Sequence, residues 1–113
     1  MTPRELFPQQ AVCWFELAPN ECEEQLESLA GWLAWLKLRY ALDHRALPDC
    51  WAQHGALIEE LSALAGGWSR AFNARDTGYT PLSWHVDFAA TRRRVAEWIS
   101  RSGCRPEAHR PEA

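Results

Sequence analysis

The sequence predicts an all-α protein: a three-helix bundle with an extended N-terminal arm and a disordered C-terminal tail. Apolar residues recur at spacings of three and four along three separate segments, which is the period of a helix that buries one face. Six of the seven tryptophans fall inside these segments. Each tryptophan buries a large apolar area, so these residues should define much of the core. A chain of 113 residues, 47% of them hydrophobic, is long enough to form one domain without disulfides or metal.

Residues 1–19 are expected to form the arm, because they hold three of the seven prolines and show little periodicity. Within the arm, residues 11–17 (AVCWFEL) fit either a short strand or an extended segment. We expect the side chains of Trp14 and Phe15 to pack on the helices.

The first helix is predicted to begin at Asn20, a good N-cap, with Glu23 at the capping-box position. Its apolar spacing alternates between four and three, which favours a helix packed lengthwise against its partners. The stripe consists of Cys22, Leu26, Leu29, Leu33, Leu36 and Tyr40. Because Trp32 and Trp35 lie beside that stripe, the second half of the helix is apolar over most of its circumference. Such a helix is either central in the bundle or has a further partner.

The second helix is predicted to open at Pro48 and Asp49, since proline is tolerated in a first helical turn. Its stripe consists of Cys50, His54, Leu57, Leu61, Leu64 and Trp68. The pair Gly66-Gly67 lies within this pattern. Each glycine destabilises a helix by about 1 kcal/mol relative to alanine. Either the helix is weak there, or a neighbouring backbone or indole comes close.

The third helix is predicted to begin at Thr80-Pro81, as N-cap and first residue, and to stop at Gly103. Residues 73–79 then form a loop, residues 20–103 form the bundle, and residues 104–113 form the disordered tail. The apolar stripe of this helix consists of Trp84, Phe88, Val95 and Trp98, with Ile99 adjoining. One core cluster is expected to unite Leu33, Leu36, Leu57, Leu61, Trp84, Phe88 and Val95.

The predicted compartment is the cytoplasm, because the sequence shows neither a signal-peptide layout nor an apolar run long enough for a bilayer. The four cysteines match no disulfide framework and are interpreted as reduced thiols. The net charge of −3 divides into −6 over residues 1–64 and +3 over residues 65–113. The basic excess therefore lies in the C-terminal half.

Four residues are predicted to form a structural polar cluster: Cys50, His54, His85 and Asp87. Cys50 and His54 are four residues apart, which places a thiol and an imidazole on one helical face. With His85 or His44 they could bind zinc, and as a thiol–imidazole pair they could provide a nucleophile. Because both occupy core positions and a second close ligand pair is lacking, we predict no metal and no cofactor.

The third helix is basic, and its arginines are Arg92, Arg93, Arg94 and Arg101. Contact with nucleic-acid phosphates is one interpretation. Three consecutive residues fan over about 200° of a helix, however, so at most two of them can face one surface. The other interpretation is a solvated face that pairs with the acids of the first helix, which are Glu21, Glu23, Glu24 and Glu27.

Several short motifs follow one another in a particular order: Cys13-Trp14, Trp32-x-x-Trp35-Leu36, Arg39-Tyr40, Pro48-x-Cys50-Trp51-x-x-His54, Glu59-Glu60-Leu61 and Pro81-x-x-Trp84-His85. Over residues 11–100 this order resembles a group of small tryptophan-rich proteins of unknown function. They are encoded on actinobacterial plasmids, integrative conjugative elements and phages. The resemblance implies a cytoplasmic accessory protein of a mobile genetic element, and it implies no activity, cofactor or site residue.

The leading functional hypothesis is a non-enzymatic helical adaptor that binds a protein partner, including a second copy of the chain. Its candidate contact residues are Trp32, Trp35, Trp51 and Trp68, on helices that already have full apolar stripes. The first alternative is a nucleic-acid-binding accessory protein that uses the basic third helix. The second is a small metal- or thiol-dependent enzyme around Cys50, His54 and His85.

Overall fold

The computed structural model of the chain describes residues 2, 3, 7, 11–72 and 78–104. These residues contain three α-helices, α2 (Pro19–Arg39), α3 (Gly55–Ala71) and α4 (Tyr79–Ser102). Two short 3-10 helices, η1 (Trp14–Glu16) and η2 (Trp51–Gln53), precede α2 and α3. Within the described residues there is no strand, and the all-α prediction is confirmed.

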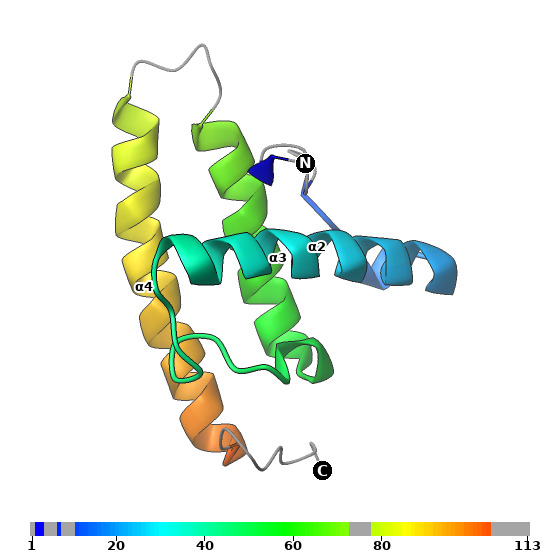
Figure 1. Cartoon of the computed structure of the whole chain (residues 1–113). Coiled ribbons are helices and arrows are strands. Elements are labelled where there is room, and N and C mark those ends of the chain that lie inside the picture. The colour runs from blue at the N-terminus through cyan, green and yellow to red at the C-terminus, as the bar shows by residue number, and fades with distance from the viewer. Residues whose placement is uncertain (1, 4–6, 8–10, 73–77, 105–113) are drawn as a thin grey trace.

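The helices form a pair with a third helix laid across it (Figure 1). The helices α3 and α4 run antiparallel and pack side by side, whereas α2 crosses over both of them. The prediction that the first helix packs lengthwise is therefore wrong. Its buried side chains begin only at Leu29 and continue through Trp32, Leu33 and Leu36, because the first turns of α2 extend beyond the pair. None of the described helices combines the length and the apolar character needed to cross a membrane.

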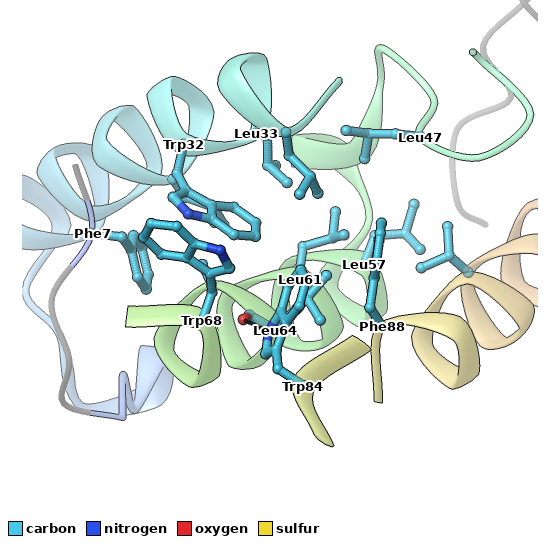
Figure 2. Close-up of a cluster of buried hydrophobic side chains, with 14 of the residues drawn as sticks. Phe7, Trp32, Leu33, Leu47, Leu57, Leu61, Leu64, Trp68, Trp84 and Phe88 are labelled. Atoms are coloured by element: carbon cyan, nitrogen blue, oxygen red, sulfur yellow. Dashed lines mark hydrogen bonds between the residues drawn. The ribbon is translucent and has the colours of Figure 1, made fainter. Parts of the chain in front are cut away.

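The core lies where α2 crosses the other two helices (Figure 2). All seven residues predicted to meet in one cluster do so, and the prediction is confirmed. Phe7 from the N-terminal segment completes the cluster beside Trp32 and Trp68. The second half of α2 is therefore central in the fold, because Phe7 covers part of it.

Aromatic rings form a continuous chain through this core. The ring centroids of Trp35 and Trp68 are 5.0 Å apart, and Trp68 stacks on Phe72 at 5.0 Å. On α4, Trp84 stacks on Phe88 at 5.0 Å, and its indole Nε1–H donates to the Leu64 carbonyl at 3.1 Å. These contacts within the chain cover ring faces and edges, which are therefore not available to a partner protein.

The predicted helix starts are displaced, whereas the final stop is confirmed. The N-cap of the first helix is Ala18, two residues earlier than expected, with Pro19 in the first turn and the Ala18 N–H donating to the Glu21 carboxylate at 2.9 Å. Asn20 is thus inside the helix and is not its N-cap. The last helix ends at Gly103, whose φ of 77° is the left-handed conformation that glycine adopts without strain.

The second helix starts later than predicted. Pro48 and Asp49 precede a turn and η2, and α3 begins only at Gly55. His54 is extended, with φ of −124° and ψ of 111°, and this residue is both the C-cap of η2 and the N-cap of α3. The last helix, α4, begins at Tyr79 and not at Thr80. Its N-cap is Gly78, which has a φ of 101°. Most of the predicted loop, residues 73–77, lies outside the described residues.

The arm contains the 3-10 helix η1, and its two aromatic residues behave differently. The Trp14 indole Nε1–H donates to the Ser62 hydroxyl on α3 at 3.0 Å, as the packing prediction requires. Phe15 is 98% exposed, so the same prediction is wrong for it. A single turn of helix cannot direct two adjacent side chains to the same surface.

The indole of Trp84 lies close to Gly67. A close indole was one of the two predicted explanations for the glycine pair in this helix. A Cβ atom on Gly67 would lie 3.6 Å from Cδ1 of Trp84. The predicted stripe on α4 is wrong at its end, because Trp98 is partly exposed and Ile99 packs on the core in its place.

Candidate functional site

The four tryptophans proposed as partner contacts belong to the core. Trp32 and Trp68 are buried, and Trp35 and Trp51 are partly buried against the same cluster. The prediction that they form an exposed interface is therefore wrong. Where α2 crosses the other helices, Trp32, Leu33 and Leu36 are buried, whereas Leu38 stays exposed.

A different apolar surface is exposed, on the N-terminal half of α4. Tyr79, Leu82 and Val86 are 75%, 66% and 67% exposed. At about 100° per residue they lie within about 60° of one another, on the side of the helix opposite Trp84, Phe88 and Val95. Ala89 and Ala90 continue this side towards the middle of the helix. We call these five residues the α4 stripe.

The α4 stripe could have been found in the sequence. Its residues are separated by three and four positions, which is the same period that identified the buried stripe of this helix. A helix with two apolar stripes on opposite sides needs two sets of neighbours. The second stripe contains no tryptophan, and most of its apolar residues are smaller than Trp84 and Phe88 of the buried stripe.

The arginines of α4 do not form one surface. Arg94 lies on one side, where its Nε–H donates to the Glu60 carboxylate of α3 at 2.6 Å. Arg92 lies about 160° around the helix from it, with its guanidinium 5.5 Å from the Phe88 ring centroid. Arg101 lies 5.1 Å from the Trp98 ring centroid. Pairing of Arg94 with an acid of the first helix is thus a wrong expectation, since its partner is on α3.

The predicted polar cluster divides into two places. Cys50 and His54 meet as expected, with Sγ and Nε2 separated by 3.5 Å. His85 is elsewhere, exposed on α4 beside Tyr40, and Asp87 is also exposed. Grouping these four residues was wrong, because the start of α3 and the start of α4 lie at opposite ends of the antiparallel pair.

The third member of the buried cluster is Cys104, which the prediction had placed in the tail. Its Sγ lies 3.3 Å from His54 Nε2 and 3.7 Å from Cys50 Sγ. All three side chains are buried, and their ligand atoms lie within 4.8 Å of one another. Residues 105–113 of the predicted tail lie outside the described residues.

Local backbone structure explains how these three side chains come together. The left-handed conformation of Gly103 reverses the chain at the end of α4, and the Cys104 N–H then donates to the Ser102 hydroxyl at 3.2 Å. Cys50 is the N-cap of η2, and the extended His54 separates η2 from α3. The helix stop was visible in the sequence, but the position of the next residue depends on tertiary structure.

Burial raises the pKa of the Cys50 thiol, and its hydrogen bond with Cys104 raises the pKa further. The thiol is therefore neutral at physiological pH, whereas an activated cysteine nucleophile needs a lowered pKa and access to solvent. None of the four cysteines, all of which are among the described residues, is in a disulfide.

Tyr40 and His85 form a second polar contact at the surface. His85 Nδ1 donates to the Pro81 carbonyl at 2.8 Å, because a carbonyl can only accept. In the neutral ring Nε2 then accepts from the Tyr40 hydroxyl at 2.9 Å. Burial raises the pKa of Tyr40, and the Arg39 charge opposes this increase. The contact joins the end of α2 to the side of α4.

In comparisons with known proteins, no family model, curated protein or solved structure matches the chain.

Proposed function

We propose that the protein is a non-enzymatic helical adaptor that acts by protein–protein contact, and that its α4 stripe pairs with the α4 stripe of a second copy. The observation that carries the proposal is the exposure of Tyr79, Leu82 and Val86 on the side of α4 that faces away from the core. Contiguous exposed apolar side chains on a helix are typical of a helix-docking surface.

A second copy fits the stripe better than an unrelated helix because the stripe is self-complementary. In an antiparallel pair centred on Val86, Leu82 faces Ala90 of the other copy. A large residue thus meets a small one on both sides of the two-fold axis. Tyr79 then faces Arg93, which suits the attraction between a guanidinium and an aromatic ring. Such an interface uses the same surface on both subunits.

The dimer is expected to be weak. The stripe covers only the first half of α4, since Arg93 and Glu97 occupy the same side further along. Interfaces that bury less than about 1,200 Å² in total are usually transient. The monomer and dimer should therefore exchange as the protein is diluted.

Sedimentation velocity over a concentration series tests the proposal. The wild type should shift from monomer to dimer with increasing concentration. Val86→Glu should remain monomeric, because two carboxylates would face each other across the two-fold axis. Phe15→Glu is the matched control, since it also changes an exposed apolar residue but lies on η1, away from α4. A monomeric wild type, or a dimer unaffected by Val86→Glu, would overturn the proposal.

The antiparallel register has its own test. Leu82→Glu and Ala90→Lys should each weaken the dimer. Mixing the two variants should restore a heterodimer, because the introduced charges face each other in this register. Failure of the mixture to associate, with each variant folded, would reject the register.

The setting proposed for this adaptor is a mobile genetic element of an actinobacterium. It rests on the order of tryptophan-containing motifs over residues 11–100. Relaxase or translocase genes beside the gene for this protein would support a role in transfer. A conserved housekeeping operon around it would contradict this setting while leaving the adaptor proposal intact.

A further inference from the structure

Cys50, His54 and Cys104 come together from parts of the chain that are distant in sequence. Cys50 and His54 flank η2, and Cys104 follows the end of α4, 54 residues after Cys50. All three are buried. Among the described residues they form the one group of three or more histidine, cysteine or acidic side chains arranged so that they could hold a metal ion.

The distances between the three ligand atoms match the edges of a tetrahedral zinc site. With Zn–S bonds of about 2.3 Å and Zn–N bonds of about 2.0–2.1 Å, two sulfurs lie about 3.8 Å apart and sulfur and nitrogen about 3.5–3.6 Å apart. The observed Sγ–Sγ distance is 3.7 Å, and the two Sγ–Nε2 distances are 3.5 and 3.3 Å. The three atoms would move by only a few tenths of an ångström to bind the ion.

We propose that Cys50, His54 and Cys104 bind one Zn²⁺ ion. Two thiolates and an imidazole are ligands that zinc prefers. The fourth tetrahedral position is left for a water molecule or an external donor. Metal coordination deprotonates a thiol outright, so both cysteines would bind the ion as thiolates.

The ion would have a structural effect. It would link the C-terminal end of α4 to the N-terminal end of α3. These two ends lie side by side, at the opposite end of the pair from the point where the chain passes from α3 to α4. Because the site forms only in the folded chain, zinc binding should stabilise the fold. This inference does not depend on the proposed pairing of α4 with a second copy.

Oxidation to a disulfide is the main competing use of the two cysteines. An S–S bond is about 2.05 Å long, so the sulfurs at 3.7 Å would have to approach much further than zinc requires. A disulfide would also make no use of His54, whose Nε2 lies within 3.5 Å of both sulfurs.

The test uses the full chain, reduced and stripped of metal with a chelator, and then titrated with Zn²⁺ alone. We expect one equivalent to bind and the melting temperature to rise. Cys50→Ser and Cys104→Ser should each weaken zinc binding by more than about 100-fold. Removing only a hydrogen-bond partner of a metal-ligating side chain typically costs roughly 10–100-fold in affinity, and loss of the ligand itself should cost more. Matched controls are Cys22→Ser and His85→Gln, which alter the same residue types outside the cluster and should bind like the wild type.

Cobalt provides a readout that does not rely on the variants folding. Co²⁺ added to the metal-free wild type should show the intense visible absorption of a tetrahedral ion and thiolate-to-metal charge transfer, and one equivalent of Zn²⁺ should remove both. Three results would overturn the proposal: failure of Zn²⁺ to bind stoichiometrically, binding lost equally on Cys22→Ser, or a Cys50–Cys104 disulfide in freshly purified protein.

Discussion

The two sides of α4 have similar apolar residues and opposite surroundings. On one side Trp84, Phe88 and Val95 are buried against α2 and α3, whereas on the other Leu82 and Val86 are about two-thirds exposed. Helical periodicity is equally clear on both sides. The comparison shows that an apolar stripe indicates a need for neighbours, and that the arrangement of the remaining helices decides which stripe obtains them within the chain.

The largest expected difference between the two sides is in stability. Trp84→Ala should destabilise the fold by about 3–5 kcal/mol, because it leaves a cavity beneath stacked rings and removes the hydrogen bond to Leu64. Val86→Ala, on the exposed side, should change the free energy of unfolding by less than about 0.5 kcal/mol. Denaturant unfolding measures both free energies. The protein should be dilute enough that further dilution does not change the result, so that only the monomer contributes. Equal effects would contradict the assignment of the two sides.

Tyr40 sharpens the comparison at the border between the sides, where its hydroxyl meets His85. Tyr40→Phe should cost about 1 kcal/mol at neutral pH, the usual net value of a hydrogen bond. Since the folded-state pKa of Tyr40 is raised above its ordinary value of 10.0, its proton stabilises the fold below about pH 10. That stability is lost as the pH rises further. The free energy of unfolding of the wild type and of Tyr40→Phe should be measured from pH 8 to about pH 11, and it should fall less for Tyr40→Phe. An equal fall in the two proteins would contradict this assignment.

Gly67 tests how closely the buried side approaches α3. Gly67→Ala places a methyl group 3.6 Å from the Trp84 indole, which is ordinary van der Waals contact. The gain in helix propensity should therefore appear, as about 0.5–1 kcal/mol of added stability in thermal or denaturant unfolding. A loss of stability would mean that the indole cannot accept a methyl group there.

The second half of α4 offers a smaller contrast between neighbouring arginines. Arg94→Ala removes a partly exposed ion pair with Glu60 and should cost roughly 0–1 kcal/mol. Arg93→Ala, which projects from the same side as the α4 stripe, should have almost no effect on the free energy of unfolding. A double-mutant cycle with Glu60→Ala isolates the pair, and a zero coupling energy would show that the ion pair contributes nothing.

The smallest expected effect concerns nucleic acid. Arg92 lies about 160° around the helix from Arg94, and Arg94 pairs with Glu60, so the four arginines do not all face one phosphate-binding surface. Duplex DNA binding at about 0.15 M salt should be weak, and Arg93→Ala combined with Arg94→Ala should change it little. A complex tighter than about 1 µM at that salt, lost in the double variant, would replace the adaptor proposal with a nucleic-acid-binding function.

Local sequence signals accounted for much of the fold. The three helical segments, the stop at Gly103 and the seven-residue core were all predictable, because they depend on periodicity and on the backbone freedom of glycine. Helix starts were less predictable. Asn20 and Thr80 are good capping residues by type, yet α2 and α4 begin earlier because neighbouring residues also adopt capping conformations.

The candidate sites divide in the same way. The spacing of Cys50 and His54 was sufficient to predict their contact, although the helical turn expected between them is η2 and not the main helix. Cys104 carried no local signal, since it lies 54 residues after Cys50 in the sequence. The exposure of the α4 stripe was equally hidden, because periodicity identifies a stripe without identifying its neighbours.

By itself the sequence determined which segments become helices and which side chains require burial, because helix period and side-chain hydrophobicity act over a few neighbouring residues. Only the tertiary structure decided that α2 crosses the antiparallel pair with Trp32 and Trp68 buried in the core, that one side of α4 remains exposed, and that Cys104 meets His54. These results depend on contacts between segments far apart in the chain. The physical reason is that packing is a competition among apolar surfaces of the whole molecule.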